Sequence, residues 1–379
     1  MELGSKHSVR AAEALLDELA VGGAMSLRIA TNSAGHAAGG EAAVAQAVVT
    51  WAQATADARL VTYASDAGDI QLERLPRHLV GMTASLVCDS ATAKDGATVG
   101  PAIRRTALAR LEVLQGWQPQ HGSRGPQIEI LCADHIGRSH PATLYDLEDH
   151  ERPSVRPAKA FKDLGKLLLD TVMLAGMVKA MPTGLAGAIG DALYELFRNT
   201  DQHALTDVSG NHLHRSVRGI HARRHSLEPG ALESIVGDSL PLLEYCRRRR
   251  PRAGRQHVEL AEFSVFDSGP GLAARWLKRT TEDRDEEKQA VVDCFKRHGT
   301  TQGVRGRGMG LPIVIAALRE RKGFLRLRTG RQSLFADLSE EAGLPFAAPP
   351  TLLSWPGEKL PSRASGTLLT FLLPIEDAE

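Results

Sequence analysis

The sequence predicts a mixed α/β protein, and three observations lead to this class. Through the first 150 residues, short apolar segments alternate with amphipathic helical segments. Later, an apolar run at 263–266 ends in a glycine-containing turn, and a glycine-rich stretch at 306–310 opens an apolar helix. The composition, 42% hydrophobic and 24% charged, is that of an ordinary globular chain.

A boundary between two domains is predicted where charged residues and prolines gather, at residues 148–153. The 379 residues are enough for two domains, each with a sizeable core. We therefore expect a small N-terminal α/β domain over residues 1–152 and a second domain over residues 153–379.

The first domain is expected to alternate helices with strands. Its helices are predicted at 8–21, 41–58, 73–92 and 101–116, and its strands at 26–31, 59–64 and 128–132. The glycines at 35–40 form a loop, but a P-loop is excluded because no Lys-Ser or Lys-Thr pair follows them. His135, His140 and His150 match no standard zinc spacing, so solvated loop histidines are favoured over a metal site there.

The second domain is expected to be a layered arrangement of helices and strands. Its helices are predicted at 161–181, 191–204, 231–246, 285–297 and 312–318, and its strands at 214–225, 257–267, 323–329, 332–338 and 366–374. The stretch 343–365, which contains five prolines, is predicted to be an irregular connection.

Charge, cysteine usage and hydropathy indicate the cellular compartment in which the protein is expected. A net charge of +1 produces no overall field that would attract nucleic acid or a membrane. Its four cysteines are widely spaced, which favours reduced thiols. The N-terminus lacks the layout of a signal peptide, and no run of about 18 apolar residues suggests a membrane span. We expect a cytoplasmic protein with no membrane contact.

One predicted helix carries a stripe of chemically useful side chains. Glu195, Asn199 and His203 are spaced four residues apart, so they share one helix face. A carboxylate, an amide and an imidazole in a row suit a water, a divalent ion and a phosphate. Alternatively, three polar residues at this spacing form a solvated stripe on a surface helix.

Three further motifs follow the stripe in order. Asp267 ends a predicted strand, and Gly269 and Gly271 after it allow a sharp turn and a close approach of the backbone to a ligand. The stretch 306–311 offers unobstructed amides and a helix N-terminus to an anion. Gly366 and Thr367 then start the last strand.

Taken in this order, the four motifs resemble the ATP-binding domain shared by gyrase, the heat-shock chaperone of that group, histidine kinases and MutL (the GHKL superfamily). The resemblance covers roughly residues 155–379 and implies a Bergerat-type α/β sandwich that binds ATP and Mg²⁺. It implies Glu195 as general base, Asn199 as magnesium ligand, and His203 at the lid or phosphate. The remaining implied nucleotide contacts are the adenine contacts Asp267, Gly269, Gly271 and Thr367, and the lid residues Gly306, Arg307, Gly308, Gly310 and Leu311. The first 150 residues resemble no family that we recognise.

Departures from the family narrow the expected function. The predicted helix at 161–181 contains no histidine to accept a phosphoryl group, and with nine residues after Thr370 we expect none of the later domains of gyrase, MutL and the chaperone. We expect a slow Mg²⁺-dependent ATPase that acts as a conformational or dimerisation switch toward a partner protein. The alternatives are a protein kinase acting on serine or histidine of a partner, and a nucleotide sensor without turnover. Arginines within 247–255 also permit nucleic acid binding, although a solvated helix end is favoured.

Overall fold

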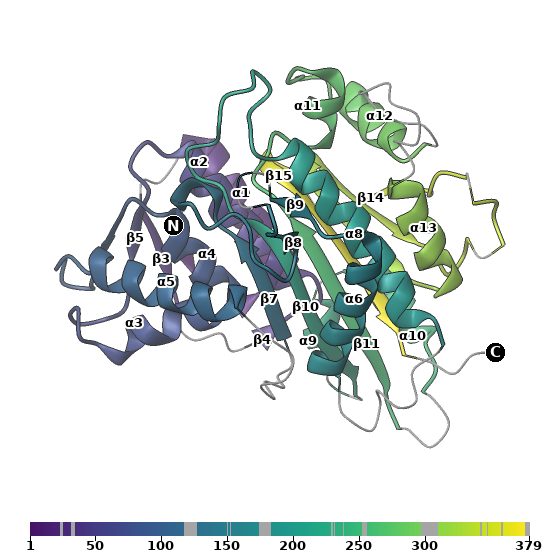
Figure 1. Ribbon diagram of the computed structural model, residues 1–379, viewed down its shortest axis with the longest axis horizontal. Coiled ribbons are helices and arrows are strands. Elements are labelled where there is room, and N and C mark those ends of the chain that lie inside the picture. Colours follow the sequence, from purple (N-terminus) through teal and green to yellow (C-terminus); the bar gives the residue numbers. More distant parts are fainter. Residues whose placement is uncertain are drawn as a thin grey trace.

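Two β-sheets organise the chain, one in each half (Figure 1). The computed structural model describes residues 1–22, 26–31, 35–116, 127–149, 151, 153–173, 183–228, 230, 232–237, 239–251, 256–296, 310–341, 343–346, 348–357 and 359–375. Within these residues the fold combines helices with parallel and antiparallel strands, so the predicted mixed α/β class is confirmed.

The N-terminal half contains a parallel sheet of short strands in the order β1-β3-β5-β6. These strands are β1 (Glu2–Leu3), β3 (Ser26–Ile29), β5 (Arg59–Val61) and β6 (Ser90–Thr92). The helices that connect and cover them are α1 (Val9–Gly22), α2 (Gly40–Ala54), α3 (Ile70–Arg74), α4 (Leu79–Val87) and α5 (Gly100–Gln115). A short parallel pair, β2 (Lys6–His7) and β4 (Gly35–His36), lies before α2. Parallel strands need such crossover helices, and this explains the alternation in the sequence.

The C-terminal half contains a larger antiparallel sheet in the order β14-β13-β12-β15-β11-β10-β7. Its strands are β7 (Gln127–Cys132), β10 (Arg218–Leu227), β11 (Val258–Phe266), β12 (Phe324–Gly330), β13 (Gln332–Asp337), β14 (Leu353–Ser354) and β15 (Ala364–Pro374). Strand β11 is buried along its whole length, and its neighbours are β10 and β15.

Helices cover both faces of this large sheet (Figure 1). On one face α6 (Ala158–Val172), α8 (Leu185–His203) and α13 (Gly310–Glu320) bury an apolar core with Val265 of β11 and Leu369 of β15. On the other face α2 packs against Phe266 and Leu368, which belong to the core of the N-terminal half. The alternation of neighbouring residues between the two cores follows from the two-residue period of a strand.

A pair of glycines lets α6 and α8 approach closely. A side chain at Gly165 would come within 2.6 Å of Ala186 O, and one at Gly190 within 2.4 Å of Phe161 O. Since neither glycine carries a side chain, the backbones of α6 and α8 meet directly.

Several predicted elements have different bounds in the structure. Pro76 interrupts the helix predicted at 73–92, which divides into α3, a 3-10 turn η1 (Leu75–Arg77), α4 and β6. The helix predicted at 231–246 is also divided, into α9 (Leu232–Val236) and α10 (Leu240–Arg247), because Ser239 caps a new helix that has proline in its first turn. The helix predicted at 161–181 corresponds to α6, which begins earlier and ends at Val172, where Met173 has extended backbone; residues 174–181 lie outside the described residues.

One strand has a different partner from the one expected. The sequence assigns 128–132 to the first domain, but β7 pairs antiparallel with β10 and forms an edge of the large sheet. Gly219 of β10 makes this possible, since a side chain there would come within 2.3 Å of Ile130 O. The two halves of the chain therefore interlock before residue 152.

The remaining short elements connect this framework. They are the 3-10 turn η3 (Asp134–Ile136), the hairpin strands β8 (Tyr145–Asp146) and β9 (Ser154–Val155), and the helices α11 (Leu272–Leu277) and α12 (Arg284–Cys294). Across the described residues, no helix has both the length and the apolar character needed to span a bilayer.

Candidate functional site

Asp267 stands directly after β11, where the strand ends in the glycine-containing turn. Its Oδ1 accepts hydrogen bonds from Gly269 N at 2.8 Å and from Thr367 N at 3.2 Å, and its own N–H donates to Thr367 O at 3.0 Å. The side chain is buried, and this burial raises its pKa to about 6. A buried carboxylate held by two backbone amides is a fixed acceptor whose charge depends on pH near neutrality.

Gly366 brings the last strand against this aspartate. Its φ is +68°, and a side chain there would come within 1.9 Å of Asp267 O. Its N–H donates to Gly269 O at 2.6 Å. Only glycine fits this left-handed conformation in so little space. The motifs at 267–271 and 366–367, about a hundred residues apart in sequence, therefore touch directly.

Thr329 completes the arrangement from β12. Its Oγ1 accepts from Leu272 N at 2.9 Å and lies 3.4 Å from Oγ1 of Thr367. A side chain at Gly271, whose φ is +87°, would come within 2.7 Å of the same oxygen. The structure thus assembles Asp267, Gly269, Gly271, Thr329, Gly366 and Thr367, which we call the Asp267 cluster. Thr329 was not among the residues predicted from the sequence, because the single Gly330 beside it forms no recognisable motif.

Helix α8 carries the predicted polar stripe. Glu195 is buried, whereas Asn199 and His203 are half-buried. Glu195 Oε2 forms an ion pair of 2.8 Å with Arg198. Burial raises the pKa of Glu195, and the charge of Arg198 opposes that rise. The stripe is therefore not a fully solvated surface, which was the alternative interpretation of its spacing.

The first residue of α13 lies against this glutamate. A side chain at Gly310 would come within 2.7 Å of Glu195 Oε2. Leu311 is buried in the core shared with α8. The structure therefore brings Gly310 and Leu311 to the stripe, whereas Gly306, Arg307 and Gly308 lie outside the described residues.

The C-terminal end of α8 adjoins the Asp267 cluster. A side chain at Gly269 would come within 2.8 Å of Ala204 Cα, directly after the helix. Arg275 of α11 donates from Nη2 to His203 O at 2.6 Å and to Thr206 O at 2.7 Å. Arg275 thereby ties the helix end to the turn that follows Gly271. An arginine four residues after a glycine carries no spacing signal, so Arg275 was not predictable as part of the site.

Helix α2 of the N-terminal half holds the cluster from the other face of the sheet. Gln53 Nε2 donates to Ser268 O at 3.0 Å, and Gln46 Nε2 donates to Ser365 O at 3.0 Å. Thr50 Oγ1 accepts from Ser365 N at 2.9 Å. Ser268 and Ser365 each neighbour a residue of the cluster, so the N-terminal half determines the backbone position of both segments.

The other candidate residues, the loop histidines and the arginine-rich segment, make contacts within the fold. The ring nitrogens of His135 lie 3.0 Å from Ser216 O and 3.0 Å from Leu86 O, and His140 stacks edge-on against Tyr145, while His150 lies outside the described residues. In the arginine-rich segment, Arg248 pairs with Asp337 and Glu340, and Arg249 packs over Tyr245. Arg252 and Arg255 are outside the described residues. The four cysteines are free thiols.

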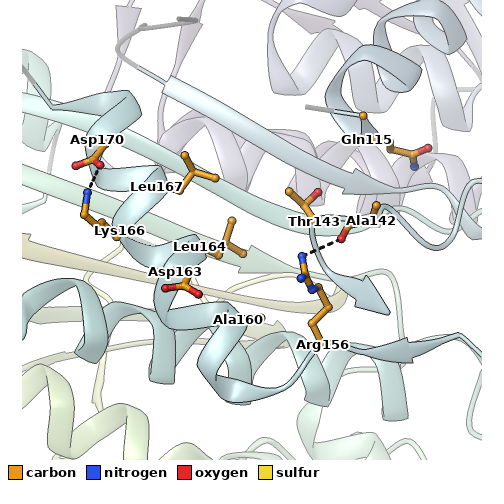
Figure 2. A pocket seen from close by; sticks show the side chains of 11 residues that line it. Gln115, Ala142, Thr143, Arg156, Ala160, Asp163, Leu164, Lys166, Leu167 and Asp170 are labelled. Atoms are coloured by element: carbon orange, nitrogen blue, oxygen red, sulfur yellow. Dashed lines mark hydrogen bonds and ion pairs between the residues drawn. The ribbon is translucent and has the colours of Figure 1, made fainter. Parts of the chain in front are cut away.

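A separate pocket of about 550 Å³ lies between α6, the segment 142–143 and the end of α5 (Figure 2). Leu164 and Leu167 line it, Lys166 pairs with Asp170, and Arg156 donates to Ala142 O. None of the motif residues contributes to it, so we do not assign the motif chemistry to this pocket.

Comparison of the chain with protein-family models, with curated proteins and with solved structures found no match.

Proposed function

We propose that the chain is a Mg²⁺-dependent ATP-binding protein that hydrolyses ATP slowly and uses it as a conformational or dimerisation switch. The observation that supports this most is the convergence of motifs far apart in sequence. Gly310 meets Glu195, Gly269 meets the end of α8, and Gly366 meets Asp267. If the four motifs were unrelated, they would not be expected to contact one another. In this proposal the large sheet with α6, α8 and α13 is the Bergerat-type sandwich.

Asp267 is proposed to recognise adenine. Both backbone amides donate to its Oδ1, so we assign Oδ2 to the exocyclic amine of the base. The amine is a donor, and an acceptor at this position favours adenine over guanine. Gly269 and Gly271 let the backbone approach the ring, and Thr367 contributes a hydroxyl beside it.

The stripe on α8 is proposed to act at the phosphates. Asn199 offers an amide oxygen to Mg²⁺, which the triphosphate oxygens and water would coordinate as well. Glu195, one turn earlier, orients and deprotonates the attacking water when it is ionised. His203 and the lid, with Gly306, Arg307, Gly308 and Gly310, are proposed to contact phosphate oxygens.

The link between the two halves supports a switch. Helix α2 donates hydrogen bonds beside both Asp267 and Gly366. Nucleotide binding at the cluster would therefore shift the conformation of the N-terminal half, and a conformational change in that half would shift the nucleotide affinity by the same coupling free energy. We propose that this change is transmitted to a protein partner or a second copy in the cytoplasm.

The proposal is tested by following γ-labelled ATP with purified protein and Mg²⁺. We expect Glu195→Ala to bind ATP like wild type but to release phosphate at least ~100-fold more slowly, since general-base catalysis supplies about that factor. Asn199→Ala should lose the Mg²⁺-dependent part of ATP affinity. Gln202→Ala, an exposed change on the same helix, is the matched control and should behave like wild type.

Each outcome separates the candidates. Phosphate release that survives in Glu195→Ala contradicts the assigned base. Label that appears on an added partner protein, instead of as free phosphate, identifies a protein kinase. Tight binding with neither product identifies a sensor, and no binding of ATP by folded wild type refutes the proposal.

A further inference from the structure

A second group of chemically able side chains is buried in the N-terminal half. His7 ends β2, Glu41 lies in the first turn of α2, and His78 precedes α4. All three are buried, and a ligand atom from each lies within 4.8 Å of those of the other two. We propose that His7, Glu41 and His78 bind a divalent transition-metal ion of the zinc class.

The donor set suits such an ion. Two imidazole nitrogens and one carboxylate are a common ligand combination for Zn²⁺, and imidazole discriminates against Mg²⁺ and Ca²⁺. Burial lowers the pKa of His7 to about 3, and the charge on protonated His78 lowers it further in the same direction. Burial also lowers the pKa of His78, to about 4. Both rings are therefore neutral at physiological pH, which is the form that coordinates a metal.

The carboxylate is oriented by neighbouring donors. Glu41 Oε1 accepts from Leu79 N at 3.0 Å, and Glu41 Oε2 lies 3.1 Å from Nη1 of Arg223. Such outer partners hold a ligating carboxylate in one position. Burial raises the pKa of Glu41 to about 7 despite Arg223, so a cation beside it would restore the charged form.

Binding of a metal ion by His78 would change the hydrogen bond that its ring makes with the Gly81 amide. His78 Nδ1 accepts from Gly81 N at 3.2 Å, so the ring proton is on Nε2. Coordination through Nε2 moves that proton to Nδ1 and removes the acceptor of Gly81, while coordination through Nδ1 replaces Gly81 by the ion. In both cases one long hydrogen bond is exchanged for a coordinate bond, and the Gly81 amide reports the event.

The full chain, stripped with a chelator, would be titrated with Co²⁺ and then with Zn²⁺. We expect one equivalent of Co²⁺ with visible d–d absorption and no thiolate charge-transfer band, and displacement by Zn²⁺. His78→Asn keeps a good helix cap, and Glu41→Gln keeps an acceptor for Leu79 N. Each should weaken binding by more than the roughly 100-fold typical of outer-shell changes. His140→Asn, outside the cluster, should bind like wild type.

Wild type alone also decides the proposal if a variant does not fold. Binding of Zn²⁺ should shift the NMR resonances of the Gly81 amide and of the His7 and His78 rings, but not of the His140 ring. Absence of stoichiometric binding, a thiolate band, undiminished binding in folded variants, or unmoved resonances would each overturn the site.

Discussion

Two helices hold the Asp267 cluster from opposite faces of the large sheet, and they do so by different means. Helix α8 is amphipathic: it buries Leu193 and Phe197 and carries Asn199 and His203 on its half-buried side. Helix α2 is buried from Gly40 to Ala52, and its glutamines Gln46 and Gln53 donate to backbone carbonyls. A buried glutamine must find acceptors, and those of α2 are the strand ends that carry the cluster.

This difference separates two roles. The side chains of α8 face the position that we assign to the nucleotide, so changes there should alter binding or turnover with little effect on the fold. Those of α2 set the backbone of Ser268 and Ser365, so changes there should alter stability and nucleotide affinity together. Three further predictions concern the cluster and its support from α2, beginning with the cluster itself.

Gly366→Ala should have the largest effect. A methyl group at φ +68° and 1.9 Å from Asp267 O combines backbone strain with a clash that no flexible side chain can relieve. We expect a loss of more than ~4 kcal/mol in the free energy of unfolding, measured by denaturant titration. Gly210→Ala is the matched control: its φ is +89° but nothing lies within 4 Å, so only the backbone strain of about 1–2 kcal/mol applies. Equal losses in the two variants would contradict the contact.

Gln53→Ala should have an intermediate effect. Its amide donates to Arg215 O at 2.8 Å and Ser268 O at 3.0 Å, and removal leaves both carbonyls short of a donor. We expect a loss of about 2 kcal/mol in stability together with weaker ATP binding. Gln115→Ala is the control, because this amide also donates to two carbonyls, Leu131 O and Arg138 O, away from the cluster. If both variants bind ATP equally well, α2 has no special role at the site.

The third prediction, the pH dependence of ATP binding, is the smallest effect of the three at neutral pH. Since the pKa of Asp267 is about 6, the carboxylate is ionised at pH 7 and becomes protonated below 6. Protonation removes the acceptor for the adenine amine, so ATP affinity should fall by up to ~10-fold for each pH unit below 6.

Asp267→Asn should bind ATP more weakly than wild type and lack this dependence. ATP itself titrates in the same range, so the ratio of wild-type to variant affinity, measured by calorimetry, isolates the residue. A ratio that stays constant from pH ~5 to ~8 would contradict the assigned contact.

The fold was predictable where its signals are local. Helical spacing predicted α8, apolar runs predicted β11 and β15, and the glycines of 267–271 and 366 marked turns that the structure confirms. Pro76 and the Ser239 cap were also local signals, but the helical periodicity around them concealed the breaks at 73–92 and 231–246.

The sequence by itself determined the class of fold, the approximate bounds of most strands of the large sheet, and the candidate residues Glu195, Asn199 and Asp267, because periodicity and glycine conformation act over a few residues. Only the tertiary structure decided that β7 joins the large sheet, that Thr329 and Arg275 support the cluster, and that α2 holds it from behind. It also placed His7 beside Glu41 and His78. These are contacts between distant segments, whose partners depend on how whole helices and sheets pack and leave no periodic trace in the chain.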